Sequence, residues 1–390
     1  MSSAKSQHPP LPLPEGISQY PLYCAANDLT FHVLEAGYTP EKNKPLLLLL
    51  HGFPELAFSW RKIMPSLADA GYYVVAVDQR GYGRTTGWDD SVFAKVNLAE
   101  FTMTNLVRDL VILVNALGYS KVHCVIGHDF GAGAVSSSMC ALMRPDMFGS
   151  VAMMSHPFKQ PPTPPFNTAR LQTSSPESFK DIHMELASLS EPRKHYKWYN
   201  STSLAAFHWS VPAQGLHSFL RGYLHLKSAD WKGNNPHPLE AWKASELPKM
   251  PYYYIMPLHS SMPEVVASLM EEEDVTKTMS WMPDEDLAVY VQEWCRTGFQ
   301  GGLNWYRSQT DPVQQRDMYL FAGKKIEVPA TFISGEKDWG NYQQPGALEG
   351  FPQSCTQFRG VKIIEGAGHW PQQEQPEKVV KELLFFLDGL

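Results

Sequence analysis

The chain has 390 residues, of which 43% are hydrophobic, and its formal net charge at pH 7 is −7. This length fits one large domain with an insertion, or two to three small domains, and the apolar content is that of a globular protein with a sizeable core. The lack of a basic surplus argues against a nucleic-acid surface. The five cysteines are odd in number and lack metal-ligand spacing, which favours reduced thiols, no metal and a cytoplasmic location: Cys24, Cys124, Cys140, Cys295 and Cys355.

The first 20 residues are rich in proline and polar side chains, and they lack the apolar centre of a signal peptide. We expect residues 1–20 to form a loose arm. The leucine run from 46 to 50 is too short to span a bilayer, so it predicts a buried strand instead of a membrane segment.

Strand-like and helix-like segments alternate from residue 29 to residue 154. This alternation predicts an α/β fold with a mostly parallel central sheet and helices on both faces. The expected strands are 29–36, near a sheet edge, 45–50, 72–77, 122–126 and 150–154. The expected helices are 59–70, 101–117 and a segment of small residues that ends near 143.

The alternation stops after Ser155, where a Pro-rich stretch leads into an aromatic-dense region that extends to about residue 310. It resumes with expected strands 329–334 and 362–364 and a helix over 376–387. We therefore predict a core of residues 21–158 and 310–390, with a large, mainly helical lid of residues 159–309 inserted after the sixth core strand. Ligands bind beyond the carboxyl ends of parallel strands, so such a lid would cover the site.

The segment KVHCVIGHDFGAG, residues 121–133, has the strand–turn–helix pattern of a nucleophile elbow. In this pattern a G-x-nucleophile-x-G turn lifts one side chain above the sheet, and its glycines allow the strand and helix to approach closely. The central residue here is Asp129, where serine or cysteine is the usual nucleophile.

A carboxylate is ionised at neutral pH, so it can attack without a general base. Attack on an amide or ester would give a high-energy anhydride, whereas attack on an sp3 carbon bearing a strained oxygen or a halide gives an ester. Water can then hydrolyse that ester. Asp129 therefore points to epoxide opening or halide displacement, with a simple helix-capping aspartate as the alternative.

The partners of such a nucleophile stand after the last two expected strands. His369 is predicted to be the general base that activates water, and Asp338 is predicted to orient its imidazole, with Glu336 as a substitute. The oxyanion hole is expected from the backbone N–H groups of Phe53 and Phe130. Pro54 suggests a cis bond or a rigid turn that aims the first of these.

These residues resemble the epoxide hydrolases of the α/β-hydrolase fold. The segment HGFPELAFSWRKIMP is similar to the HGFPE and SWR motifs of that family, and DQRGYGRT is similar to its RGYG turn. GHDFGA is similar to the GHDWGA elbow, and TGFQGGLNWYR is similar to the motif that carries the second lid tyrosine.

The resemblance implies a cofactor-free hydrolase that makes a vicinal diol, with two lid tyrosines donating to the epoxide oxygen. The second tyrosine corresponds to Tyr306. The first is assigned to Tyr199, with Tyr196 as an alternative. The lid aromatics suggest a mostly apolar, bulky small-molecule substrate, and the candidate substrate-binding residues are Trp198, Phe207, Trp209 and Trp370, although such aromatics can equally form the core of the lid.

Two departures bear on the alternatives. Phe130 and Phe53 stand where dehalogenase relatives have halide-binding Trp and Asn, and neither side chain can donate a hydrogen bond, so the epoxide interpretation is favoured. Trp198, Trp209 and His208 keep a carbon–halogen hydrolase, such as a haloacid or haloalkane dehalogenase, under consideration, beside a specialised ring-opening hydrolase on a natural product. A non-catalytic ligand receptor is the third alternative. The sequence leaves the oligomeric state open, a homodimer being one option.

Overall fold

The computed structural model describes residues 8–161 and 181–390. Its main sheet has eight strands in the order β1-β2-β4-β3-β5-β6-β9-β10. The pairs β1–β2 and β2–β4 are antiparallel, and the other neighbours are parallel. This confirms the predicted mostly parallel sheet. The strands are β1 (Ile17–Cys24), β2 (Leu29–Ala36), β3 (Leu46–Leu50), β4 (Tyr73–Val77), β5 (Cys124–His128), β6 (Val151–Met154), β9 (Ile326–Gly335) and β10 (Cys355–Ile364).

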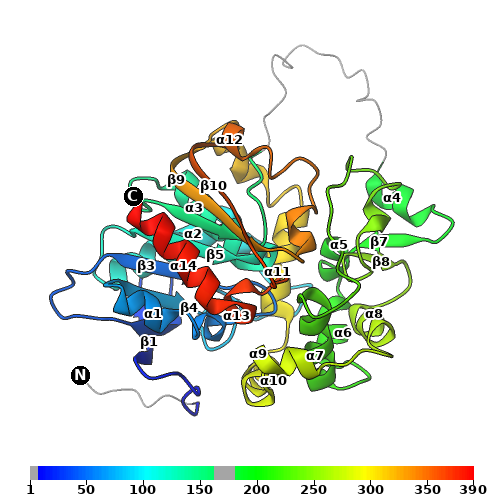
Figure 1. Cartoon of the computed structure of the whole chain (residues 1–390), viewed down its shortest axis with the longest axis horizontal. Coiled ribbons are helices and arrows are strands. Elements are labelled where there is room, and N and C mark those ends of the chain that lie inside the picture. Colours follow the sequence, from blue (N-terminus) through cyan, green and yellow to red (C-terminus); the bar gives the residue numbers. More distant parts are fainter. Residues whose placement is uncertain (1–7, 162–180) are drawn as a thin grey trace.

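The all-leucine strand β3 lies between β4 and β5 and is buried on both faces. Because side chains alternate along a strand, odd and even leucines enter different cores. Leu46, Leu48 and Leu50 join the cluster that includes residues of α2 (Met103–Ala116) and α3 (Ala134–Met143). Leu47 and Leu49 join the cluster on α1 (Met64–Asp69) and α14 (Pro376–Asp388). Helices therefore cover both faces of the sheet, as predicted (Figure 1).

Several expected elements differ in extent. β1 starts at Ile17, within the segment expected to be a loose arm, and forms a hairpin with β2. β2 is therefore second from the sheet edge. The expected helix over 59–70 is divided into the 3₁₀ helix η1 (Ala57–Trp60) and α1, because Pro65 lacks an N–H and fits only the first turn of a helix.

Between β6 and β9 the chain leaves the sheet and forms mainly helices, as predicted, and Figure 1 shows most of them beside the core. Two short strands in this insertion pair antiparallel. Residues 162–180 of the predicted lid lie outside the described residues. The insertion comprises α4 (Ile182–Ala187), β7 (Arg193–His195), α5 (Tyr196–Asn200), α6 (Ala205–Ser210), α7 (Leu216–Lys227), η4 (Leu247–Lys249), β8 (Ile255–Pro257), α8 (Met262–Leu269), α9 (Thr276–Trp281), α10 (Asp284–Thr297) and α11 (Gln300–Thr310).

Two tryptophans of the insertion fasten it to loops of the core. The indole N–H of Trp294 donates to the carbonyl oxygen of Pro54 at 2.8 Å, and that of Trp305 donates to the carbonyl oxygen of Arg80 at the same distance. Both side chains are fully buried. Much of the aromatic density seen in the sequence thus packs the insertion and its junction with the core.

The helices not yet named are short and lie in the segments predicted to form the core, residues 21–158 and 310–390. They are η2 (Leu98–Phe101), η3 (Asp129–Gly133), η5 (Arg316–Phe321), η6 (Trp339–Asn341), α12 (Phe351–Ser354) and α13 (Pro371–Glu374).

Candidate active site

The predicted elbow is present where β5 ends. Asp129 has a φ of 70°, which is in the left-handed region that costs energy for a residue with a Cβ. The chain then makes a wide π-helical turn, η3, before α3 begins. A Cβ on Gly127 would lie 2.0 Å from the carbonyl oxygen of Gly133, and one on Gly52 would lie 2.4 Å from the Cβ of Asp129. The glycines therefore make room for the strained turn and its carboxylate.

Asp129, His369 and Asp338 come together in the order that the sequence predicted. Nε2 of His369 lies 3.1 Å from Oδ2 of Asp129. Nδ1 of the same ring lies 3.0 Å and 3.1 Å from the two carboxylate oxygens of Asp338. All three residues are buried. Glu336, the substitute for Asp338, is exposed at the end of the same strand region and makes no such contact with His369.

Hydrogen bonds and nearby charges keep the carboxylate of Asp129 ionised. Burial alone would raise the pKa of Asp129, but the hydrogen bond from His369 and the nearby positive charges hold that pKa well below its usual range. Burial likewise opposes ionisation of Asp338, and His369 with the Gly340 amide outweighs it, so the pKa of Asp338 is lowered. Asp129 is therefore available as an anion at neutral pH.

One expected oxyanion donor contacts the Asp129 carboxylate directly. The backbone N–H of Phe53 donates to Oδ1 of Asp129 at 3.1 Å. The Phe53–Pro54 peptide bond is cis, which was one of the two conformations that the sequence suggested. Phe130 follows Asp129 in the elbow turn, and a role for its amide stays a prediction.

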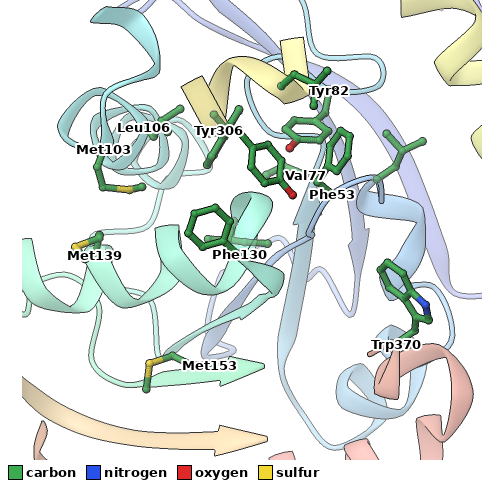
Figure 2. Close-up of a cluster of buried hydrophobic side chains, with 14 of the residues drawn as sticks. Phe53, Val77, Tyr82, Met103, Leu106, Phe130, Met139, Met153, Tyr306 and Trp370 are labelled. Carbon is green, nitrogen blue, oxygen red and sulfur yellow. The ribbon is translucent and has the colours of Figure 1, made fainter. Parts of the chain in front are cut away.

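Two tyrosines of the insertion lie over the elbow. The ring of Tyr306, on α11, is 5.6 Å from the ring of Phe130 and 5.4 Å from that of Phe53, centroid to centroid. Tyr196, the first residue of α5, packs its ring 6.1 Å from that of Tyr306. Burial, and next the charge of Asp129, raise the pKa of both phenols well above 10, so both keep their protons. Figure 2 shows Phe53, Phe130 and Tyr306 gathered together.

Tyr199, the first assignment for the lid donor, is not brought to this group. Its hydroxyl lies 3.1 Å from Nδ1 of His208 and accepts a hydrogen bond from the N–H of Met262 at 3.1 Å. Lys194 lies over its ring. The phenol is thus occupied within the insertion, whereas Tyr196, the alternative, packs against Tyr306.

The four candidate substrate-binding aromatics have different environments. Trp198 lines a cavity of about 570 Å³. Trp209 is buried against Phe53, with its indole N–H donating to Oδ1 of Asn200 at 3.2 Å. Trp370 packs its ring 4.6 Å from that of His369. Phe207 is 63% exposed and lies on the surface, so it has no place in the site. The reason is that Phe207 and Trp209 lie on opposite sides of the short helix α6.

The cavity also has polar walls, formed by residues that the sequence patterns did not single out. Phe130, which follows Asp129, forms one wall, and His156, Lys159 and Lys197 are among the other lining residues. A proline-rich stretch and an aromatic-rich helix carry these three basic side chains, and neither pattern marks them as part of a site.

A second buried pair, His128 and Glu55, connects the residue before Asp129 to the backbone of His369. Nδ1 of His128 lies 2.6 Å from Oε2 of Glu55, and its Nε2 lies 2.6 Å from the carbonyl oxygen of His369. Gln372 and Gln373 donate to the same carboxylate. Burial would lower the pKa of His128, but the Glu55 charge outweighs it and raises that pKa. Both residues belong to motifs quoted above, HGFPE and GHDFGA, yet the spacing alone assigned them no role.

The described part of the chain contains no cluster of His, Cys, Asp and Glu side chains suited to a metal ion. Within the same ranges, no helix has both the length and the apolar character needed to cross a bilayer.

Comparisons with known proteins agree with this geometry. Residues 45–181 match the model of the alpha/beta hydrolase fold family. This matched segment contains Asp129 and its elbow. Epoxide hydrolase B of Mycobacterium tuberculosis is 32% identical over 366 residues, which cover 91% of this chain and 94% of that protein. Epoxide hydrolase A of the same organism is 31% identical, with coverage of 93% and 96%.

Solved structures give the same result. The epoxide hydrolase from an endophytic Streptomyces superposes with a TM-score of 0.73 at 26% identity and covers 96% of both chains. Epoxide hydrolase A from Mycobacterium thermoresistibile gives a TM-score of 0.71 at 30% identity, with 96% of this chain and 99% of that chain covered. The chain belongs to the epoxide hydrolases of the α/β-hydrolase fold.

Proposed function

We propose that the protein opens an epoxide to a vicinal diol through a covalent ester on Asp129. The observation that carries this proposal is an aspartate, not a serine, at the tip of the elbow, 3.1 Å from a histidine that a second aspartate holds. An ionised carboxylate in this position can displace oxygen from a strained carbon, and the adjacent base can then release the product.

In the first step a carboxylate oxygen of Asp129 forms a bond to one epoxide carbon, and the electrons of the breaking C–O bond move to the epoxide oxygen. Tyr306 and Tyr196 are the donors that we assign to that oxygen. Both phenols are protonated and buried, and a donor in a water-poor site stabilises developing negative charge more strongly than one in water. Transfer of a proton from one of these phenols to the alkoxide completes ring opening and leaves a tyrosinate.

In the second step Nε2 of His369 takes a proton from water, and the resulting hydroxide attacks the carbonyl carbon of the Asp129 ester. Asp338 holds Nδ1 of the ring and stabilises the imidazolium that forms. Negative charge builds on the ester carbonyl oxygen, toward which the Phe53 N–H is directed. The intermediate collapses by breaking the bond between the carbonyl carbon and the diol oxygen, and that oxygen takes the proton of the imidazolium. The proton left on the Asp129 carboxyl group returns to the tyrosinate, so the carboxylate and the phenol are both restored.

The test uses His369→Gln, which should form the ester and hydrolyse it slowly. The variant is mixed with an aryl epoxide, and the intact mass is recorded. We expect a gain equal to the whole epoxide, mapped to the peptide that contains Asp129. His369→Gln carrying Asp129→Asn as well is the matched control and should gain no mass under the same conditions.

The same experiment with a haloacetate decides the carbon–halogen alternative. A gain equal to the haloacetate less its hydrogen halide would assign the protein to that chemistry. No adduct with either compound would contradict an Asp129 ester and would favour a receptor without turnover. The apolar side chains of Phe53 and Phe130, and the use of the His208 ring by Tyr199, favour the epoxide outcome.

A further inference from the structure

The cavity lined by Phe130, the residue that follows Asp129, has basic side chains on its walls, and Asp129 itself is not among its lining residues. Its polar lining includes Lys159, Lys197 and His156, while its apolar lining includes Phe130 and Trp198. No aspartate or glutamate from the described ranges lines it. A cavity of this kind is suited to a molecule that is partly apolar and carries negative charge.

Lys197 is the most informative of these residues. It is buried at the start of α5, and its Nζ lies 3.3 Å from the centroid of the Phe130 ring. Within residues 8–161 and 181–390, no carboxylate forms an ion pair with it. Burying an ammonium without an anion is costly, and a cation–π contact offsets only part of that cost. A ligand anion would supply the missing charge.

His156 supplies an independent observation on the same wall. It is buried, and its ring lies 4.9 Å from the Phe130 ring. Its Nδ1 has no hydrogen-bond partner in the described part of the chain. Buried polar atoms are rarely left unpaired, so this nitrogen also points to a ligand atom. Lys197 and His156 therefore both flank Phe130, the neighbour of the nucleophile.

We propose that the natural substrate is an epoxide that carries a carboxylate, and that Lys197 and His156 bind this carboxylate while Asp129 attacks the ring. The proposal rests on the epoxide hydrolase function given above. Lys197 would form a charge-assisted hydrogen bond to one carboxylate oxygen, and His156 would donate to the other. The apolar walls would hold the carbon chain between the two groups. Because these contacts need a negative charge, the enzyme should prefer an epoxy acid over its neutral analogue.

The charge state of Lys197 gives this specificity a pH dependence. Burial, followed by the charge of Lys159, lowers the pKa of Lys197 to about 7, while Asp129 opposes the shift. The titratable groups of the neighbouring elements also include His156 and His195, which the Lys197 charge influences in turn. Above that pH the free enzyme loses the ammonium, so kcat/KM for an acid should fall, while kcat/KM for a neutral amide should not follow the same decline.

The experiment compares epoxy acids with their primary amides, which have nearly the same shape but no charge. Aryl epoxides with the carboxylate one, three or five carbons from the ring are assayed at pH 6 for kcat/KM. We expect the wild type to prefer at least one acid over its amide by about 10- to 100-fold, the range for a hydrogen bond between charged groups. Lys197→Met should bring this ratio close to one, and Lys197→Arg should restore part of it.

Lys194→Met is the matched control, because Lys194 is a partly buried cation on β7 that contacts the Tyr199 ring and does not line the cavity. It should keep the wild-type ratio. Thermal unfolding shows whether Lys197→Met is folded. If it is not, the inference is tested by the acid-to-amide ratio of kcat/KM in the wild type and by the pH dependence of kcat/KM in Lys197→Arg.

Three results would overturn the inference. Equal kcat/KM for every acid and its amide in the wild type would do so while leaving epoxide hydrolysis intact. An unchanged preference in folded Lys197→Met would remove the role of that residue. Failure of the wild type to hydrolyse acids and amides alike, with no adduct on His369→Gln, would overturn both this inference and the proposed function.

Discussion

Replacing Tyr196 by phenylalanine should slow ring opening and leave the stability of the fold almost unchanged. The same change at Tyr199 should lower the stability and leave the rate of ring opening almost unchanged. The two residues are three positions apart on α5 and differ in what their hydroxyl groups contact. The hydroxyl of Tyr196 has one long hydrogen bond, 3.3 Å to Oε1 of Gln343, and its ring packs against that of Tyr306. The hydroxyl of Tyr199 serves Met262 and His208 inside the lid.

The expected magnitudes follow from these contacts. Removing one donor to a developing oxyanion in a buried site lowers the rate about 100-fold, which corresponds to ~2.7 kcal/mol. Tyr196→Phe should therefore reduce the ring-opening rate constant by about two orders of magnitude. Tyr199→Phe leaves the buried N–H of Met262 without its acceptor, which costs ~1–3 kcal/mol of unfolding free energy.

The assay uses both substitutions in the His369→Gln background, where the ester should accumulate because its hydrolysis is slow. The rate of mass gain with an aryl epoxide then reports ring opening alone, and chemical denaturation reports stability. Hydrolysis of the ester in the His369 wild-type background should change little in either variant. A slow ring-opening step in Tyr199→Phe, with Tyr196→Phe normal, would refute the assignment drawn from the structure.

Three further predictions concern the support of the site and the thiols. Gly52→Ala should abolish activity or folding, because its Cβ would lie 2.4 Å from that of Asp129, whereas Gly149→Ala, whose Cβ would have no contact closer than 3.4 Å, should be close to neutral in enzyme assays and denaturation. Glu55→Gln should lower stability at neutral pH by ~1–3 kcal/mol. Burial alone would raise the pKa of Glu55, but its partner His128 lowers that pKa below 4.5, so the stabilising contribution of Glu55 in the wild type is present above that pH and is lost as the pH falls. Between pH 3.5 and 7, the midpoint of thermal unfolding should therefore fall less steeply toward low pH in the variant than in the wild type. An equal decrease in both proteins would contradict this prediction. A thiol reagent should label Cys295 alone in the folded protein, since the other four cysteines are buried, and labelling of two or more would contradict the buried thiols.

The central residues of the candidate site could be predicted from the sequence because they belong to local patterns. An elbow needs a strand, small residues and a nucleophile at fixed spacing, and these features are contiguous from residue 121 to residue 133. Residues at the ends of successive parallel strands meet at one edge of the sheet, so His369 and Asp338 could be placed beside Asp129 without coordinates. The five-leucine strand likewise predicted its own burial.

Other features depended on how segments distant in the sequence pack together. Tyr196 and Tyr199 are both buried on one short helix, and only its packing against α11 decided which phenol lies near Tyr306. In the same way, α6 placed Phe207 on the surface and Trp209 in the core.

The basic wall of the cavity was hidden for a related reason. His156 and Lys197 are far apart in the chain, and neither was assigned a role from the sequence, so their shared contact with Phe130 exists only in the folded protein. The sequence by itself determined the residues on which the proposed reaction depends, because Asp129 and its neighbours lie within short segments. The tertiary structure decided which side chains face the substrate, because that choice depends on the packing of an irregular insertion whose pattern of buried residues has no single period.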